Sequence, residues 1–336
     1  MSYQVTFLGT GGFSTALAIH LSRQNNQVTI WGRDPEYCQH LSASRVNDRH
    51  LPGIPIPREI RITGSIADSM AGSDLIVAGI PTAYLRSTLS HIASYIPACQ
   101  PVLSLVKGLE FQTLARPTQI VNEILGQRPV AVLSGPSHAE ELAQGRPTSM
   151  VVASSDKALA ELACCIFNSG SLRVYRNEDS IGVELAGALK NIMGLAAGLC
   201  DGLGFGDNAK AAMLTRGLVE MTRFALPRGA KTTTFFGLAG IGDLMTTCFS
   251  PHGRNRALGI KMAQGLTLEQ AQNSTTNVAE GVFTTFSVAQ AARELGIDMP
   301  ITAAVEKILM GQSTPRSAVA ELLSRPTGAE SFEIGP

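Results

Sequence analysis

The sequence predicts an α/β fold, in which a mostly parallel sheet with helices comes first and an all-α domain follows. Short β-branched and apolar runs such as Leu75-Ile76-Val77-Ala78 alternate with helix-like segments up to about residue 177. Runs of this kind are typical of strands that are buried on both faces of a parallel sheet. Beyond residue 177 the strand signals stop, and small and apolar helix-forming residues dominate. We therefore expect two domains, residues 1–178 and 179–336.

The composition excludes several classes of protein. The 336 residues carry 27 Lys and Arg against 27 Asp and Glu, so no basic excess is available for nucleic acid or anionic lipid. The first 22 residues lack the basic start of a signal peptide, so no targeting segment is expected there. The uncharged stretch 87–106 contains polar residues and two prolines, so it is not expected to span a membrane. The six cysteines form no CxxC motif, which indicates reduced thiols in a cytoplasmic protein.

Eight strands are expected in the first domain, mostly with helices between them. They cover residues 5–8, 28–31, 60–63, 75–80, 102–106, 130–133, 150–153 and 172–175. The first helix is expected over 15–24, and the proline-rich segment 51–57 is expected to be an extended loop without regular structure. In the second domain, small residues such as Gly194 and Gly198 predict helices that pack at short distance.

A glycine-rich loop, Gly9-Thr10-Gly11-Gly12-Phe13-Ser14, follows the first strand and opens the first helix. Glycine at Gly9 permits a tight turn, and glycine at Gly11 lets the backbone approach a pyrophosphate at the helix N-terminus. The pattern predicts a dinucleotide site of the Rossmann type, with an ordinary structural turn as the alternative. The third position is Ser14 rather than glycine, so we expect a wider spacing of helix and strand there.

The end of the second strand predicts the choice of cofactor. Arg33 can pair with a ribose 2′-phosphate and favours NADP, whereas Asp34 can accept from a free 2′-hydroxyl and keeps NAD open. A solvated charge pair is the alternative.

Two more segments follow predicted strands at the edge where parallel sheets bind ligands. Lys107 ends one strand, and Ser134-Gly135-Pro136-Ser137 ends the next before a helix expected from His138. An amine, backbone amides and a hydroxyl there can hold an anion. Ordinary turns are the alternative.

Lys190 is the only charged residue between Leu185 and Cys200, within an apolar helical segment. A buried lysine is unusual unless it is paired, and burial favours its use in proton transfer. Asp243, in a glycine-rich segment, is a candidate partner. The alternative is a lysine whose stem reaches the surface.

The basic segment Arg254-Asn255-Arg256 offers guanidinium groups suited to phosphate, with a solvated basic turn as the alternative. The spacing of the histidines and cysteines does not suit a metal site. The sequence contains no GxSxG motif, so a hydrolase that uses this motif is not expected.

Taken in order, these motifs resemble the bacterial NAD(P)-dependent glycerol-3-phosphate dehydrogenases. The resemblance runs from the glycine loop to about residue 325. It rests on seven segments: Leu-Pro-Gly-Ile (51–54), Lys-Gly-Leu-Glu (107–110), Ser-Gly-Pro-Ser-His-Ala (134–139), Glu-Leu-Ala-Gly-Ala-Leu-Lys-Asn (184–191), Gly-Leu-Ala-Gly-Ile-Gly-Asp-Leu (237–244), Arg-Asn-Arg (254–256) and Val-Ala-Glu-Gly (278–281).

The resemblance implies a Rossmann domain, a helical domain similar to the C-terminal domain of 6-phosphogluconate dehydrogenase, and an active site between them. It implies reversible reduction of dihydroxyacetone phosphate to sn-glycerol 3-phosphate, which feeds phospholipid synthesis, with Lys190 as catalytic acid and base. Implied substrate contacts are Lys107, Gly135, Ser137, Lys190, Asp243, Arg254 and Asn255. Implied cofactor contacts are Gly9, Gly11, Gly12, Phe13, Arg33, Lys107, Ala139, Arg254, Val278 and Glu280.

Two positions depart from the family pattern, Ser14 in the glycine loop and Gly253, where the family usually has serine. The second departure removes one hydroxyl from the expected phosphate cradle. A homodimer is expected by analogy with related dehydrogenases. Two other functions stay open, a β-hydroxyacid dehydrogenase of the phosphogluconate type and a nucleotide-sensing protein without catalysis.

Overall fold

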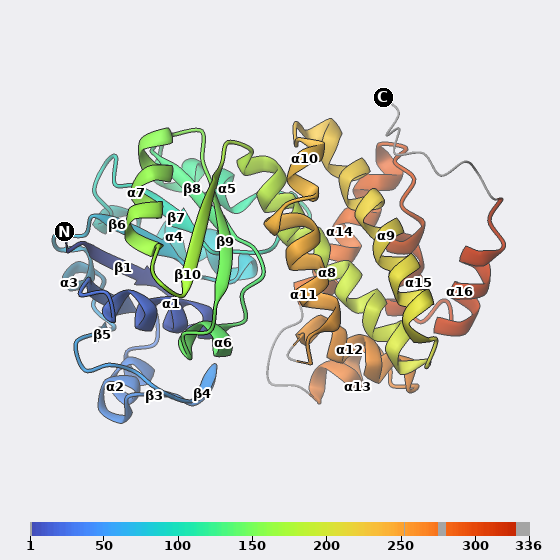
Figure 1. The fold of residues 1–336 in the computed structure, drawn as a ribbon, viewed down its shortest axis with the longest axis horizontal. Coiled ribbons are helices and arrows are strands. Elements are labelled where there is room, and N and C mark those ends of the chain that lie inside the picture. The colour runs from blue at the N-terminus through green and yellow to red at the C-terminus, as the bar shows by residue number, and fades with distance from the viewer. Residues whose placement is uncertain (1, 252, 275–279, 327–336) are drawn as a thin grey trace. The chain divides into compact units, whose positions relative to one another are not determined.

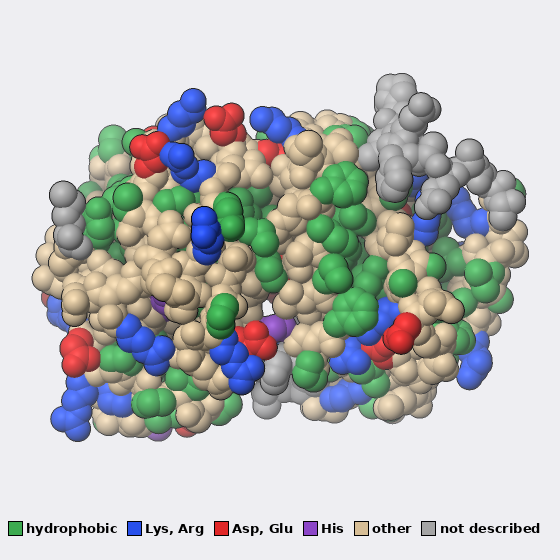
Figure 2. Space-filling model, viewed as in Figure 1, with side chains coloured by type: hydrophobic (Ala, Val, Ile, Leu, Met, Phe, Trp, Pro, Cys, Tyr) green, Lys and Arg blue, Asp and Glu red, His purple; other side chains and the backbone are tan. Residues whose placement is uncertain are grey.

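The computed structural model describes residues 2–251, 253–274 and 280–326, which divide into two compact units (Figure 1). The first unit comprises residues 1–107 and 115–180, and the second comprises 108–114 and 181–336. Sequence patterns did not predict that the short segment 108–114 belongs with the second unit. On the face drawn in Figure 2, basic and acidic side chains are interspersed over both units, in keeping with a net charge of zero.

The first unit is built on an eight-stranded sheet in the order β10-β9-β8-β7-β6-β1-β2-β5. Neighbouring strands are parallel except for β8 and β9, which are antiparallel, so the predicted mostly parallel sheet is confirmed. The strands are β1 (Gln4–Leu8), β2 (Gln27–Trp31), β5 (Arg61–Thr63), β6 (Leu75–Ala78), β7 (Val102–Ser104), β8 (Val130–Ser134), β9 (Thr148–Ala153) and β10 (Leu172–Asn177).

Helices cover both faces of this sheet because successive strand residues point to opposite sides. In β6, Leu75 and Val77 join the core beneath one set of helices, and Ile76 and Ala78 join the core beneath another. The first core includes α1 (Gly12–Ser22), α2 (Pro35–Ser44), α6 (Ala139–Ala143) and α7 (Lys157–Phe167). The second includes α3 (Ile66–Met70), α4 (Thr82–Ile92) and α5 (Pro117–Leu125), whereas the short 3₁₀ helix η1 (Ala93–Tyr95), which follows α4, has no buried residue.

The segment predicted to lack regular structure is partly a strand, so that prediction is wrong. Residues Leu51–Pro55 form β4, which pairs antiparallel with β3 (Val46–Asn47) in a separate two-stranded sheet. Proline lacks an N–H but adopts an extended backbone, so it is tolerated in a strand with only one neighbour. Pro55 therefore sits opposite Val46 in this ladder.

Among the described residues of the second unit, the regular secondary structure is helical, as predicted. The helices are α8 (Ser180–Gly202), α9 (Gly206–Ala225), η2 (Leu226–Arg228), α10 (Thr232–Phe235), the π-helical turn η3 (Leu238–Gly242), α11 (Asp243–Phe249), α12 (Arg254–Ala263), α13 (Leu268–Asn273), α14 (Glu280–Glu294), α15 (Pro300–Leu309) and α16 (Pro315–Leu323).

Helix α8 is the core of this unit. A Cβ atom at Gly198 would lie 2.0 Å from the carbonyl oxygen of Arg256, and one at Gly259 would lie 2.3 Å from that of Leu195. Glycine therefore lets α8 and α12 pack backbone to backbone, as the sequence predicted. Among the described residues, α8 alone is long and apolar enough to span a membrane, but its apolar stretch is wholly buried inside the protein, as in a core helix.

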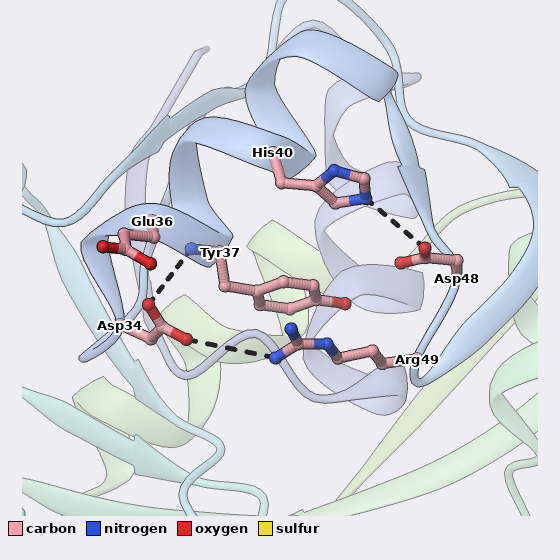
Figure 3. Close-up of a pocket in the computed structure, with 6 residues that line it drawn as sticks. All are labelled: Asp34, Glu36, Tyr37, His40, Asp48 and Arg49. Atoms are coloured by element: carbon pink, nitrogen blue, oxygen red, sulfur yellow. Dashed lines mark hydrogen bonds and ion pairs between the residues drawn. The ribbon is translucent and has the colours of Figure 1, made fainter.

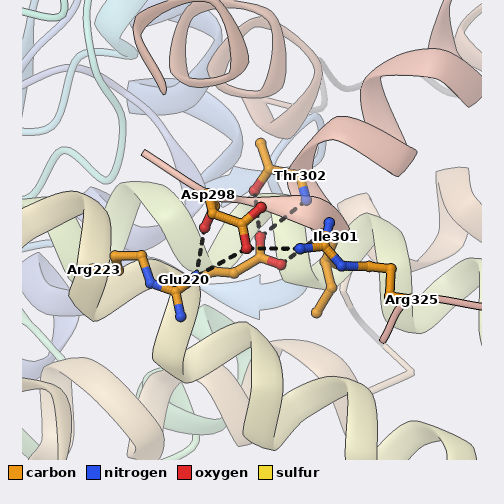
Figure 4. A network of polar contacts seen from close by, with 6 residues as sticks. All are labelled: Glu220, Arg223, Asp298, Ile301, Thr302 and Arg325. Atoms are coloured by element: carbon orange, nitrogen blue, oxygen red, sulfur yellow. Dashed lines mark hydrogen bonds and ion pairs between the residues drawn. The ribbon is translucent and has the colours of Figure 1, made fainter. Parts of the chain in front are cut away.

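A buried carboxylate joins α9 to the start of α15 (Figure 4). Glu220 accepts hydrogen bonds from the backbone amides of Ile301 (2.6 Å) and Thr302 (3.1 Å), and from the Thr302 hydroxyl (3.1 Å). These amides belong to the first turn of α15, where helix N–H groups lack partners within the helix. The Glu220 side chain thus caps a helix that is distant in sequence.

Candidate functional site

The glycine loop after β1 is packed closely against neighbouring backbone. Gly9 has a φ of +114°, and a Cβ atom there would lie 2.9 Å from the carbonyl oxygen of Gly79. At Gly12 a Cβ atom would lie 2.3 Å from the carbonyl oxygen of His50. At Gly11, by contrast, the nearest atom would be 3.8 Å away, so this backbone has open space beside it.

The N-terminus of α1 is suited to phosphate. Its N-cap is Gly11, which makes no side-chain cap, and its first turn contains no acidic residue. The first amides of the helix and its positive dipole end are therefore available to an anion. Open space at Gly11 and an uncapped helix fit the pyrophosphate of a dinucleotide.

Ser14, which replaces the third glycine of the pattern, is buried on α1. A Cβ atom at Gly79 would lie only 2.0 Å from the Ser14 hydroxyl oxygen. The missing side chain at Gly79, just beyond β6, thus provides the space that the serine needs.

At the end of β2, the two candidate ribose readers have different surroundings. The Asp34 carboxylate accepts from the backbone amide of Tyr37 at 3.1 Å and so caps α2. Its other oxygen lies 3.9 Å from a guanidinium nitrogen of Arg49. Arg33 is exposed, with its guanidinium carbon 5.8 Å from the centre of the Tyr84 ring. Asp34 is therefore engaged as a helix cap, which leaves Arg33 as the candidate for recognising the ribose.

A pocket of about 320 Å³ adjoins this strand end (Figure 3). Its lining contains acidic, basic and aromatic side chains, which are those of Asp34, Glu36, Tyr37, His40, Asp48 and Arg49. His40 faces Asp48 at 3.4 Å.

Four predicted residues meet at the ends of β7 and β8 and the start of α1. The Lys107 amine donates to the carbonyl oxygen of Gly135 at 2.9 Å, and the Ser137 hydroxyl donates to the same oxygen at 2.9 Å. The amine also lies 5.9 Å from the centre of the Phe13 ring. Gly135 has a φ of +123°, which favours glycine, and Ala139 begins α6 shortly after it.

Lys107 does not end its strand as predicted, because β7 stops at Ser104. The amine nevertheless lies at the expected carboxyl edge of the sheet, where it can donate a proton or bind an anion.

In the second unit, Lys190 is buried on α8 and paired, rather than extended to the surface. Its amine lies 2.7 Å from a carboxylate oxygen of Asp243 and 2.7 Å from the Thr247 hydroxyl. Asp243 begins α11, and Thr247 lies one turn later on the same helix. The carboxylate compensates the buried ammonium charge, and the two contacts fix the direction of its N–H groups.

Sequence patterns missed Thr247. Its only signal is the spacing of four residues from Asp243, which places both side chains on one face of α11. The neighbouring thiol of Cys248 is also buried, and this burial raises its pKa to about 12. The thiol therefore stays protonated at neutral pH and is unsuited to act as a nucleophile.

The N-terminus of α12 carries two predicted residues. Arg254 is exposed at its first position, whereas Asn255 is buried and accepts from the amide of Gly281 at 3.1 Å. The N-cap, Gly253, has no side chain to occupy the first-turn amides. A Cβ atom at Gly253 would lie 2.8 Å from the carbonyl oxygen of Thr247, so this backbone suits glycine.

Arg256 does not offer a free guanidinium fork, contrary to the sequence-based expectation. Its Nε lies 2.5 Å from Asp201, which also pairs with the amine of Lys210 at 2.9 Å, and its Nη1 donates to the Ser250 carbonyl oxygen. Of the remaining predicted residues, Glu280 begins α14, and Val278 lies outside the described residues. Within the described chain, no group of histidine, cysteine and carboxylate side chains could hold a metal ion.

Comparison with known proteins covers nearly the whole chain. A family model described as the N-terminus of NAD-dependent glycerol-3-phosphate dehydrogenase matches residues 4–160, and one for the C-terminus matches residues 179–320. The chain is 42% identical to glycerol-3-phosphate dehydrogenase [NAD(P)+] 2 of Salinibacter ruber, over 98% of this chain and 97% of that protein. It is 41% identical to the enzyme of the same name from Clostridium acetobutylicum, over 96% and 97% of the two chains.

Solved structures show the same pattern. Glycerol-3-phosphate dehydrogenase from Coxiella burnetii superposes with a TM-score of 0.92 at 35% identity, covering 96% of this chain and 99% of that one. A ketopantoate reductase family protein from Ralstonia eutropha has a TM-score of 0.62 at 15% identity, covering 94% and 99% of the two chains. The second likeness extends to the fold alone.

Proposed function

We propose a function from one premise, that the chain belongs to the NAD-dependent glycerol-3-phosphate dehydrogenase family. The protein reversibly reduces dihydroxyacetone phosphate to sn-glycerol 3-phosphate, with NADPH or NADH as reductant. The observation that supports this chemistry best is the buried Lys190 amine, which is held by Asp243 and Thr247 at 2.7 Å each.

Lys190 is the general acid of the reduction. The bound nicotinamide supplies a hydride to the ketone carbon, and negative charge develops on the ketone oxygen. The Lys190 ammonium donates a proton to that oxygen, and the resulting amine accepts it back in the reverse reaction. The Asp243 carboxylate stabilises the ammonium form, and Thr247 orients the amine. Lys107 is the alternative donor, although its amine donates to the Gly135 carbonyl oxygen.

The substrate phosphate binds at the start of α12. Arg254 supplies a guanidinium, and the first-turn amides of a helix without a side-chain cap supply further donors. Asn255 adds a buried amide group. Fixing the phosphate uses binding energy remote from the reacting carbon to orient the ketone. Lys107, Gly135 and Ser137 are further proposed substrate contacts.

The pyrophosphate and the adenosine ribose of the nucleotide bind to the first unit. The backbone at Gly9, Gly11 and Gly12 receives the pyrophosphate, and Arg33 pairs with the ribose 2′-phosphate of NADP, the preferred cofactor. Five further residues are proposed cofactor contacts by family resemblance: Phe13, Lys107, Ala139, Arg254 and Glu280. The same resemblance includes Val278.

An absorbance assay that follows oxidation of NADPH tests this function. Turnover with dihydroxyacetone phosphate is expected, with little or none for unphosphorylated dihydroxyacetone or for the keto forms of β-hydroxyacids. A preference for the keto acids would instead support a dehydrogenase of the phosphogluconate type. Nucleotide binding without turnover of any substrate would support a sensor.

The biological setting is also part of the proposal. The enzyme acts in the cytoplasm as a homodimer and supplies glycerol 3-phosphate for phospholipid synthesis. The support is the family resemblance. Light scattering on the purified protein would detect a mass of twice the 35.5 kDa chain.

A further inference from the structure

One guanidinium beside Asp34, just after β2, has no role in the function described above. Arg49 extends along the pocket of Figure 3, with 61% of its side chain exposed. Its guanidinium carbon lies 4.0 Å from the centre of the Tyr37 ring, and one nitrogen lies 3.9 Å from the Asp34 carboxylate. The side chain is thus oriented by an aromatic face and a carboxylate, and its exposed part faces solvent.

The backbone that carries Arg49 is fixed to the glycine loop through Asn47, which is fully buried. Its amide nitrogen donates to the Thr10 carbonyl oxygen and the Thr15 hydroxyl, and its oxygen accepts from the Tyr37 hydroxyl (all at 2.8 Å) and the His50 amide (3.1 Å). One side chain therefore connects the loop, α1, α2 and the segment that carries Arg49. The close approach of the His50 carbonyl to Gly12 adds a second connection.

The charges around Asp34 determine whether the end of β2 can bind a ribose 2′-hydroxyl or a 2′-phosphate. An unpaired carboxylate at the end of β2 would accept from a ribose 2′-hydroxyl and would repel a 2′-phosphate. Here one Asp34 oxygen caps α2, and the other faces Arg49. Of the other ionisable groups that line the pocket, His40 faces Asp48, and Glu36 adds one more carboxylate. Arg49 is thus the cation that offsets Asp34.

We propose that Arg49 is a second residue that selects NADP over NAD. It neutralises Asp34 and presents a second guanidinium to the 2′-phosphate, in addition to that of Arg33. Charge-assisted contacts of guanidinium with phosphate are among the strong hydrogen bonds in proteins. This inference rests on the nucleotide site proposed above.

Direct binding of NADPH and NADH, followed by fluorescence titration, tests the proposal. Arg49→Ala is expected to weaken NADPH roughly 10-fold or more, because one charge-assisted contact is lost, and to leave NADH unchanged or slightly tighter. Arg173→Ala is the matched control, since Arg173 also lies over a tyrosine ring (Tyr175, 5.4 Å) but on β10, at the opposite edge of the sheet. The control is expected to change neither affinity.

A second substitution separates neutralisation from direct contact. Asp34→Asn keeps a side chain that can cap α2 but removes the charge. In the Arg49→Ala background it should restore part of the NADPH affinity, and no recovery would assign the whole effect to direct contact.

The outcomes distinguish this inference from the proposed function. Equal weakening of both nucleotides by Arg49→Ala, or no change in either, would overturn the inference alone, provided that the wild-type protein binds NADPH. If the wild-type protein binds neither nucleotide, the proposed nucleotide site itself is wrong.

Discussion

Lys190 has the surroundings that a proton donor requires. It is buried, so its interactions with charge are strong, and it is paired, so the ammonium form is stable inside the protein. Sequence alone singled it out because no other charged residue lies near it in the helix.

Lys190→Met should therefore depress turnover while leaving the nucleotide-binding unit intact. A positioned general acid contributes about 10²- to 10⁴-fold, so a loss of that size in kcat is expected, measured at saturating substrate. Lys107→Met should instead change mainly KM if Lys107 only binds. A Lys190→Met enzyme that folds, by circular dichroism, and keeps near wild-type kcat would remove the acid and base role from this residue.

Arg33 should determine the choice between NADPH and NADH. If it pairs with the 2′-phosphate, Arg33→Ala should weaken NADPH roughly 10- to 150-fold and NADH far less, because only NADPH carries that group. Titration of both nucleotides measures this. A similar loss for both would mean that Arg33 contacts a part that they share.

How much of the site the sequence predicts depends on how local the signal is. Lys107, Gly135 and Ser137 were found because each lies near the end of a strand, and Lys190 because it is isolated in an apolar segment. Thr247, Asn47 and Arg49 were missed, because their importance comes from neighbours that are distant along the chain or on other elements. Ordinary residue types in ordinary segments carry no signal until the chain is folded.

The strands of the sheet could be predicted from the sequence, but the residues at which they end were less predictable. Apolar β-branched runs gave all eight strands, since a strand buried on both faces needs such residues. The expected strand at 75–80 stops at Ala78, before Gly79, whose lack of a side chain serves the glycine loop and Ser14. The pairing of β3 with β4 was missed because prolines normally argue against a strand.

The α8–α12 crossing gives a test of packing. Gly198→Ala would place a methyl group 2.0 Å from the Arg256 carbonyl oxygen, so the two backbones must separate. Overpacking of this kind typically costs about 1–3 kcal/mol of unfolding free energy. Gly170→Ala, where a Cβ atom meets nothing within 4 Å, is the control. Equal stability of the two variants in urea unfolding would show that the crossing tolerates a side chain.

The Glu220 cap on α15 predicts a pH dependence of stability. Burial raises the pKa of Glu220 from 4.5 to about 7, and this effect outweighs the hydrogen bonds from Ile301 and Thr302 that lower it. The folded protein therefore holds this proton more tightly than the unfolded chain does. The resulting stabilisation is fully present below pH 4.5 and is lost as the pH rises through about 7.

Replacing this carboxyl should remove that dependence. In the wild type, Glu220 should make the unfolding free energy fall by up to about 3 kcal/mol between these pH values. Glu220→Gln should have a correspondingly flatter profile over that range, whatever its absolute stability. Urea unfolding at a series of pH values compares the two proteins, and parallel profiles would show that Glu220 does not titrate there.

The two units of the molecule contain different parts of the proposed site. The first has the uncapped helix and glycine loop that suit a nucleotide, and the second has the buried lysine and the phosphate-suited helix α12. Family resemblance unites these features into one reaction, which neither unit's motifs specify alone.

Product analysis tests that reaction most directly. Purified protein is incubated with dihydroxyacetone phosphate and NADPH, and sn-glycerol 3-phosphate is quantified beside the NADPH consumed. We predict one molecule of this enantiomer for each NADPH oxidised, and the reverse reaction when glycerol 3-phosphate and NADP⁺ are supplied. NADPH that binds without forming this product, or equally fast reduction of unphosphorylated dihydroxyacetone, would contradict the account.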